Sequence, residues 1–272
     1  MFSNITLGQY IPGRSPLHRM DPRFKLGLTV AGIVLVFVAN NFASLAVSAA
    51  LVLTAAGISG ISLRQYLKSL KGILVLILFT AALNLFYGSG EPLWQWGFLR
   101  ITTGGVSNAV FIAARIVCLI LLSAALTYTT SPTQLTDALE RAMKPLGVFH
   151  IRVHEIAMIM TIALRFVPTL LEETDKIMSA QKARGADLES GGVFQRIRAL
   201  IPILIPLFVS AFRRAYDLAT AMECRCYRGG EGRTKMKVLR FTQVDWVILG
   251  VCAVFFAAFL ALNIAFPAVT HM

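Results

Sequence analysis

The chain has 272 residues, of which 56% are hydrophobic and only 15% are charged, and its mean hydropathy is +0.69. Soluble domains carry about 25% charged residues, so this composition excludes an ordinary soluble protein and indicates an integral membrane protein. The formal net charge is +12, and its positive charges gather in residues 1–25, 61–71 and 130–241. The four cysteines suggest no disulfide framework, because two lie in apolar segments and two in a segment we place in the cytoplasm.

Five apolar segments are candidates for membrane-crossing helices. They are residues 24–39, 42–61, 72–87, 106–128 and 244–266. A crossing helix needs about 20 residues, so the first and third segments must recruit flanking residues. The sequence therefore predicts an all-α integral membrane protein with about five transmembrane helices.

The charge of the connecting segments predicts the topology. With the amino terminus inside, the three basic segments all fall on one side, and the nearly neutral connections 40–41 and 88–105 fall on the other. Because Lys- and Arg-rich connections face the cytoplasm, we expect a multi-pass cell-membrane protein with its carboxyl terminus outside. Its expected parts are a cytoplasmic segment 1–23, a four-helix transmembrane part 24–129, a cytoplasmic domain 130–241 and a last transmembrane helix 242–272.

The expected cytoplasmic domain contains about three amphipathic helices. The first covers about 131–144, and two longer ones cover about 153–183 and 193–227. Each long pattern begins apolar and ends charged. Residues 197–212 are a weak candidate for a sixth crossing, but that crossing would place many positive charges outside, against the charge rule. We therefore expect both long helices to lie in or below the inner interface.

Three prolines fall inside these long helices. Pro168 lies in the first helix, and Pro202 and Pro206 lie in the second. Proline removes a backbone hydrogen bond and bends a helix, so each is expected to be a kink.

Two arginine-bearing motifs close the long helices. Ala183-Arg184-Gly185 ends the first, Cys224-Arg225-Cys226 ends the second 41 positions later, and a glycine-rich stretch follows each. An arginine there lies at the negative end of the helix dipole and presents planar donors that suit an acidic pocket on another protein. The plain alternative is a solvated arginine near anionic lipid. The repeated placement favours docking to a partner.

Other candidates for chemistry are weaker. His150, His154 and Glu155 follow the order His-x-x-x-His-Glu rather than the zinc-protease order His-Glu-x-x-His, and Cys224-x-Cys226 has poor zinc spacing, so no metal site is expected. Arg115 lies inside the fourth apolar segment, where it has either a functional role or a structural pairing. The sequence has no phosphate-binding loop and no Gly-x-Ser-x-Gly motif. No catalytic residue and no bound cofactor are expected.

Three stretches together resemble a known family. They are residues 15–26 (SPLHRMDPRFKL), the motif at 183–185 and residues 221–230 (AMECRCYRGG). With them the chain resembles the transmembrane component of energy-coupling factor (ECF) transporters, the CbiQ-like family, over nearly its whole length. The family often has Ala-Arg-Gly at the second motif, whereas cysteines flank Arg225 here.

The resemblance implies a five-span membrane part and a coupling domain of three helices over 130–241. It implies that Ala183, Arg184 and Gly185, and likewise Cys224, Arg225 and Cys226, dock onto two ABC ATPase subunits, which themselves bind ATP. A small membrane-embedded substrate-binding (S) subunit would pack on the coupling helices for uptake of vitamins or other micronutrients. The chain itself would be a non-catalytic subunit in the lipid bilayer with no nucleic-acid partner. The alternative is a membrane enzyme or scaffold that acts without ATPases.

Overall fold

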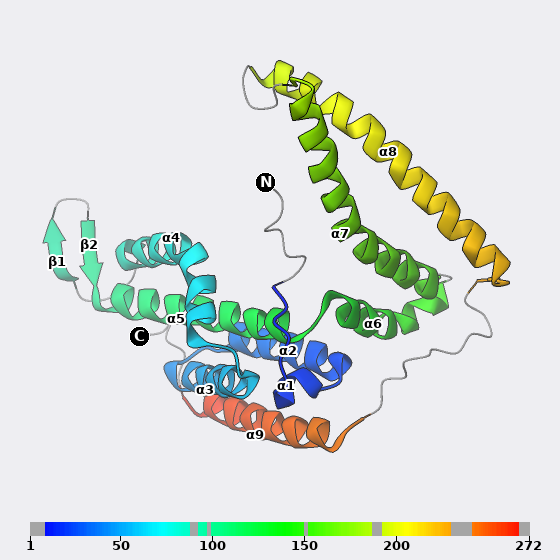
Figure 1. Ribbon diagram of the computed structural model, residues 1–272. Coiled ribbons are helices and arrows are strands. Elements are labelled where there is room, and N and C mark those ends of the chain that lie inside the picture. The colour runs from blue at the N-terminus through cyan, green and yellow to red at the C-terminus, as the bar shows by residue number, and fades with distance from the viewer. Residues whose placement is uncertain are drawn as a thin grey trace. The chain divides into compact units, whose positions relative to one another are not determined.

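A computed structural model describes residues 9–87, 92–96, 99–149, 152–186, 192–229 and 241–266 of the chain (Figure 1). The chain divides into two compact units. The described parts of 8–138 and 239–272 form one, here called the bundle unit. The described parts of 139–238 form the other, here called the crossed unit.

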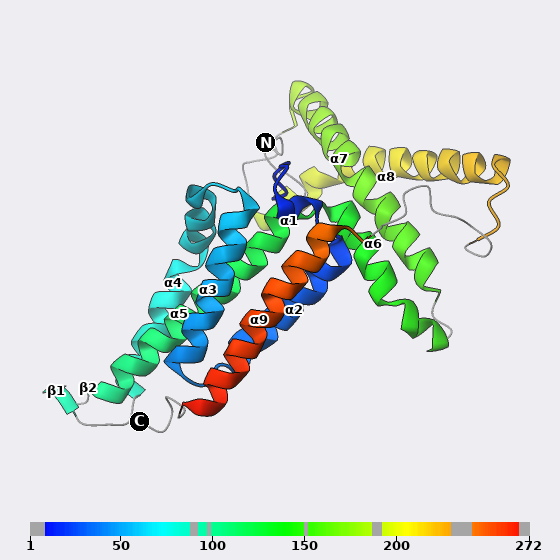
Figure 2. The ribbon, with the colours of Figure 1, turned by 90° about the horizontal axis from the view of Figure 1, so that it is seen from below.

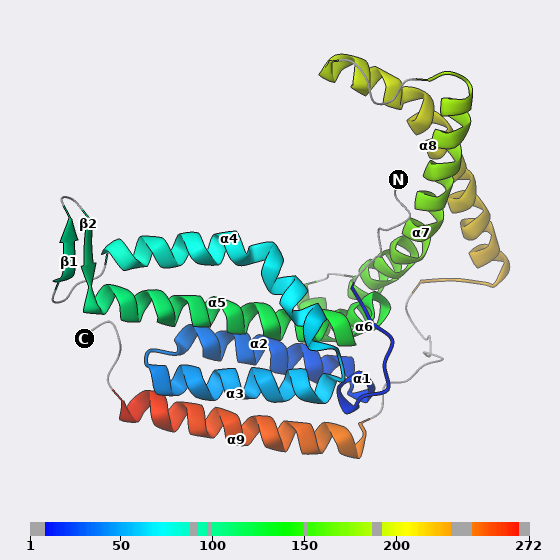
Figure 3. The ribbon, with the colours of Figure 1, turned by 60° about the vertical axis from the view of Figure 1, so that its left-hand side comes forward.

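The bundle unit consists mainly of helices. Its helices are α1 (Pro16–Arg19), α2 (Pro22–Val38), α3 (Phe42–Ser59), α4 (Leu63–Tyr87), α5 (Thr103–Thr129) and α9 (Gln243–Ala265). Between α4 and α5, strands β1 (Pro92–Trp96) and β2 (Leu99–Thr102) pair in antiparallel fashion. Helices α2, α3, α5 and α9 run side by side, as Figures 2 and 3 show. The last helix of the sequence therefore packs beside the first two long ones.

Asn41 ties the start of α3 to the end of α9. Its side-chain oxygen accepts the backbone N–H of Ser44 at 2.7 Å, which caps the first turn of α3. Its amide nitrogen donates to the carbonyls of Leu262 and Phe266, both at 3.2 Å. Beside this amide lies an apolar cluster of Ala39, Leu45, Phe111 and Phe259. One buried side chain thus joins segments more than 200 residues apart in sequence.

The structure confirms the all-α class and corrects one boundary. Four of the five apolar segments begin and end within three residues of α2, α3, α5 and α9. The third was expected to begin at residue 72, but α4 begins at Leu63 and includes Arg64, Lys68 and Lys71. The charges suggested a connection, yet arginine and lysine are good helix formers, so this basic stretch extends the helix. Figure 3 shows α4 bending along its length.

Six described helices are long and apolar enough to cross a membrane, judged by length and composition alone: α3, α4, α5, α7, α8 and α9. Helix α2 has 17 residues, which is about the lower limit for a crossing. The chain is therefore a multi-pass membrane protein. Both α7 and α8, which the charge rule keeps out of the membrane, satisfy the length criterion as well.

The crossed unit is built from two long helices. Helix α6 (Pro132–Ala142) leads into it, a 3-10 helix η1 (Lys144–Phe149) follows, and then come α7 (Val153–Ala183) and α8 (Val193–Cys224). Pro168 lies inside α7, and Pro202 and Pro206 lie inside α8, without interrupting either helix. Figure 1 shows α7 bending along its length. That the prolines act as kinks stays a prediction.

Candidate functional site

The end of α7 is closed by a left-handed glycine. Arg184 is the C-cap residue, and Gly185 follows with φ +85°. The N–H of Gly185 donates to the carbonyl of Lys182 at 3.0 Å, and the N–H of Ala186 donates to that of Gln181 at 3.0 Å. This pair of bonds is the Schellman motif, which satisfies the last carbonyls of a helix. The Arg184 side chain is left exposed just beyond the last turn.

The end of α8 repeats this geometry with a different residue. The N–H of Cys226 donates to the carbonyl of Glu223 at 2.8 Å, and the N–H of Tyr227 donates to that of Met222 at 3.0 Å. Cys226 takes the left-handed position at φ +55°, and among the described residues no other non-glycine residue has a positive φ. A side chain with a Cβ atom is disfavoured there. The end of α8 therefore keeps the fold of the motif at a conformational cost, with Arg225 exposed.

The two ends correspond residue by residue. Each backbone bond of the second end lies 41 positions after its counterpart, including the bonds from Arg184 N–H to Gln181 and from Arg225 N–H to Met222, both at 3.1 Å. The 41-residue spacing of the motif arginines therefore extends to the backbone geometry. What the sequence showed as two similar short motifs is one structural unit used twice.

Helices α7 and α8 cross at an ion pair. The Ser210 hydroxyl donates to Glu173 Oε1 at 2.5 Å, and Arg214 Nη2 donates to Glu173 Oε2 at 2.8 Å. The Glu173 side chain is 23% exposed and that of Arg214 is 40% exposed. The Ser210 hydroxyl, followed by the nearby Arg214 guanidinium, holds the pKa of Glu173 below its usual value. Figures 2 and 3 show the two helices crossing.

This ion pair lies at the centre of an approximate two-fold arrangement. Glu173 and Arg214 are themselves 41 positions apart, so they occupy equivalent places in the two helices. The helices run antiparallel, because Gln181 near the end of α7 donates to the Pro202 carbonyl near the start of α8 at 3.4 Å. Two related antiparallel helices meet at equivalent positions only where they cross. The opposite charges of Glu173 and Arg214 attract at that point, whereas two charged residues of the same kind would repel each other.

Each motif arginine lies the same distance along its helix from the crossing. Arg184 follows Glu173 by eleven residues, and Arg225 follows Arg214 by eleven. At 1.5 Å per residue, each exposed arginine is about 16 Å from the crossing along its helix. The two helices point in opposite directions, so the arginines stand at opposite ends of the pair.

The long helices also expose large apolar side chains. On α7 these include Ile159, which is 62% exposed. On α8 Phe208 and Phe212 stack with ring centroids 6.5 Å apart and are 60% and 71% exposed. Contiguous exposed apolar surface marks a protein or membrane contact.

The structure gives Arg115 a structural partner. Its guanidinium donates to the carbonyl of Ala39, the C-cap residue of α2, and lies 4.7 Å from the centroid of the Phe111 ring. A helix end leaves carbonyls without an internal partner, so Arg115 supplies a missing donor. Of the two readings of this residue, the structural pairing is the one that these contacts support.

The histidine and cysteine candidates are not brought together. His154 Nδ1 lies 3.1 Å from Glu140 Oε1, while His150 lies outside the described residues. Cys224 and Cys226 are free and exposed. Within the described ranges, no group of three or more His, Cys, Asp or Glu side chains could hold a metal ion.

Sequence reasoning missed what residues 15–26 do in the fold. Asp21 caps α2 by accepting the N–H of Arg23 at 3.0 Å, and its own N–H donates to Asp245 at the start of α9 at 2.9 Å. Lys25 Nζ donates to the carbonyl of Thr129 at the end of α5 at 3.0 Å. The Asp-Pro pair at 21–22, which is a typical helix start, was the available signal. The stretch fastens one end of the bundle.

These features define a class of protein: a multi-pass helical bundle joined to a pair of crossed helices with matching arginine-bearing ends. Residues 13–236 match the family described as cobalt transport protein, CbiQ, and the chain belongs to this family.

Three relatives carry one name, energy-coupling factor transporter transmembrane protein EcfT. The protein from Ruminiclostridium cellulolyticum is 49% identical over 94% of this chain and 96% of its own. That from Thermosediminibacter oceani is 52% identical over 89% and 91%, and that from Brevibacillus brevis is 52% identical over 91% and 94%. The chain is accordingly a multi-pass transmembrane component of an energy-coupling factor transporter.

Proposed function

We propose that the chain couples ATP binding and hydrolysis on two partner ATPase subunits to a membrane-embedded substrate-binding subunit. The observation that carries this proposal is the repeated helix end. Arg184 and Arg225 are exposed, are held by the same backbone motif and stand at opposite ends of one crossed pair. A guanidinium there can donate to carboxylates on each ATPase. The chain then needs no nucleotide site and no cofactor of its own.

The crossing suggests how motion is transmitted. When the two ATPases close on ATP, they draw the arginine-bearing ends together and change the angle between α7 and α8. The helices turn about the contact of Glu173 with Ser210 and Arg214, because it lies midway between the two ends. Exposed apolar side chains on the same helices, such as Phe208 and Phe212, then move the substrate-binding subunit that packs on them.

The remaining parts of the proposal follow from the charge pattern and the family. The basic segments, including the crossed unit, face the cytoplasm, where ATPases work, so the amino terminus is inside and the carboxyl terminus outside. The cargo is a vitamin or another micronutrient, which the substrate-binding subunit selects. The chain acts as a non-catalytic subunit.

The test is a charge reversal at both helix ends. A single charge-assisted contact is worth about 1.5–3 kcal/mol, so we expect Arg184→Glu with Arg225→Glu to abolish ATPase copurification and substrate uptake while membrane insertion stays normal. Arg213→Glu is the matched control, because Arg213 is also exposed on α8 but lies next to the crossing and away from the helix end. The docking role is wrong if the double variant still copurifies with ATPases and transports normally.

The alternative function, a membrane enzyme or scaffold acting without ATPases, gives a different result in the same experiment. In that case the unaltered chain purified from native membranes carries no ATPase subunits.

A further inference from the structure

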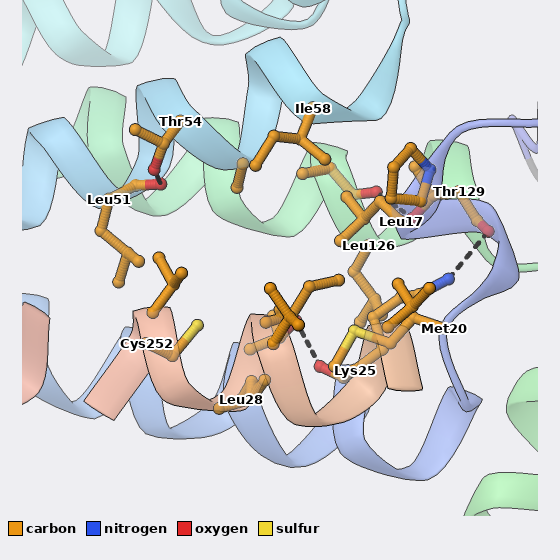
Figure 4. Close-up of a pocket in the computed structure, with 18 of the residues that line it drawn as sticks. Leu17, Met20, Lys25, Leu28, Leu51, Thr54, Ile58, Leu126, Thr129 and Cys252 are labelled. Atoms are coloured by element: carbon orange, nitrogen blue, oxygen red, sulfur yellow. Dashed lines mark hydrogen bonds between the residues drawn. The ribbon is translucent and has the colours of Figure 1, made fainter. Parts of the chain in front are cut away.

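A cavity of about 570 Å³ lies within the bundle unit (Figure 4). It runs between α2, α3, α5 and α9, and α1 borders one end. Leu28, Leu51, Leu126 and Val251 are among the apolar side chains that line its length. Its volume is within the range of small-molecule sites, about 300–1,000 Å³. A long apolar lining excludes water as the natural occupant, because buried water needs several polar partners.

The shape of the cavity follows the helix axes. On α9 its lining extends from Gln243 to Phe256, and this fourteen-residue stretch is about 20 Å long. It begins at the first residue of α9, beside the first residues of α2. The hydrocarbon core of a bilayer is about 30 Å thick, so the cavity reaches from one end of the bundle through roughly one leaflet. An extended hydrocarbon chain has this shape.

One end of the cavity carries hydrogen-bond donors. Lys25 lines it and is 3% exposed, and its ammonium donates to the Thr129 carbonyl at 3.0 Å, as Figure 4 shows. An ammonium has three donors, and the structure gives Lys25 Nζ that one acceptor among the described residues. The Thr29 hydroxyl donates to the Lys25 carbonyl at 2.7 Å, so its oxygen adds an acceptor and no donor. The end of the cavity can therefore receive oxygen acceptors.

The surrounding charges decide which kind of head group fits. Asp21 and Asp245 are 5% and 3% exposed. Both carboxylate oxygens of Asp245 already accept hydrogen bonds, from the Asp21 N–H and from Thr242, and Arg23 lies 3.8 Å from Asp21. Two basic and two acidic side chains balance here. The site therefore offers spare N–H donors without net charge, which suits the ester and phosphate oxygens of a glycerophospholipid.

We propose that this cavity is a binding site for one phospholipid, with an acyl chain between α3 and α9 and head-group oxygens on Lys25. The lipid fills the space between α9 and its neighbours at the end of the bundle where Asp21 and Lys25 fasten α2. This assignment is independent of the docking role of Arg184 and Arg225, because the cavity lies wholly within the bundle unit.

The test uses a phosphatidylglycerol that carries a photoreactive diazirine on its acyl chain. The full chain, purified in mild detergent, is mixed with this lipid and irradiated, and mass spectrometry gives the yield and position of the cross-links. Cys252→Phe places a ring in the cavity that Cys252 lines, and Val254→Phe is the control, since Val254 on the same helix is 69% exposed. Lys25→Met removes the donors, and Lys68→Met removes an exposed lysine instead.

We expect cross-links on cavity-lining residues in the unaltered chain and in both controls, competed by unlabelled phosphatidylglycerol. Cys252→Phe should abolish them, and Lys25→Met should lower apparent affinity about tenfold or more, the effect of losing a buried charge-assisted bond. Lys25→Met also removes the hydrogen bond from Lys25 to Thr129 on α5 and could disturb the fold. Cys252→Phe therefore tests the site independently of that bond.

Equal cross-linking in Cys252→Phe and Val254→Phe would overturn the site, since the label would then report bulk lipid at the surface. Unchanged affinity in Lys25→Met would overturn the placement of the head group. Competition by palmitate but by no phospholipid would overturn the ligand class.

Discussion

The left-handed position at the two helix ends makes a quantitative prediction. Gly185 has φ +85°, and a Cβ added there meets no atom within 4 Å, so Gly185→Ala introduces only backbone strain. That strain is about 1 kcal/mol for one residue, and about half of it is offset because alanine restricts the unfolded chain more than glycine does, which leaves roughly twofold in an opening equilibrium. At the second end Cys226 already carries the strain at φ +55°. Cys226→Gly should relieve this strain, but about half of the gain in stability is offset because glycine gives the unfolded chain more conformational freedom.

Hydrogen–deuterium exchange measures these changes locally, at the amides that the two Schellman motifs hold. In Gly185→Ala the Ala186 amide should exchange about twofold faster, while in Cys226→Gly the Tyr227 amide should exchange about twofold slower. Cys226→Ala separates strain from thiol chemistry, because it keeps the Cβ atom and should leave exchange unchanged. The reasoning fails if Gly185→Ala leaves the Ala186 amide as protected as before, or if Cys226→Ala slows exchange as much as Cys226→Gly.

Three further predictions concern the contacts that hold the helices. Ser210 and Arg214 lower the pKa of Glu173, so the contribution of Glu173 to the stability of the crossing is fully present above the usual glutamate pKa of 4.5 and is lost as the pH falls below that value. Spin-label distances between α7 and α8 should therefore change in that acid range, and Glu173→Gln should remove the pH dependence. Arg115→Leu leaves the Ala39 carbonyl unpaired and should destabilise the bundle by about 1–3 kcal/mol, read as a lower midpoint of thermal unfolding in detergent that Arg115→Lys does not fully restore. Asn41→Ala removes a helix cap worth about 1 kcal/mol and both ties to α9, so exchange should increase at the ends of α3 and α9 together; an increase confined to α3 would contradict the tie.

Hydrophobic periodicity located most helices because their apolar runs are long and end at polar or glycine-rich residues. Helix α7 has the predicted bounds, Val153–Ala183, since charge and a glycine mark its end. The start of α4 was wrong because Arg64, Lys68 and Lys71 have the charge of a connection and the propensity of a helix.

Contacts between distant segments were harder to predict. The partner of Arg115 is a backbone carbonyl 76 positions away, and which carbonyl a helix end leaves unpaired depends on how helices pack. The pairing of Glu173 with Arg214 was within reach, because the 41-residue spacing of the motif arginines also relates these two residues. What was missing was that the two helices run antiparallel, which brings equivalent positions together at the crossing.

Because the motif arginines are equally spaced from Glu173 and Arg214, the two helices extend by equal lengths from their crossing to their arginine-bearing tips. Forces of equal size that draw the two tips together exert opposite torques on the two helices about their crossing, so the angle of crossing changes while the net force on the pivot is zero. A force on one tip alone would instead also displace the pivot and strain the Glu173 contacts. In the proposed mechanism, this geometry distinguishes equal forces on both tips from a force on one tip, whatever the affinity of a partner for each tip.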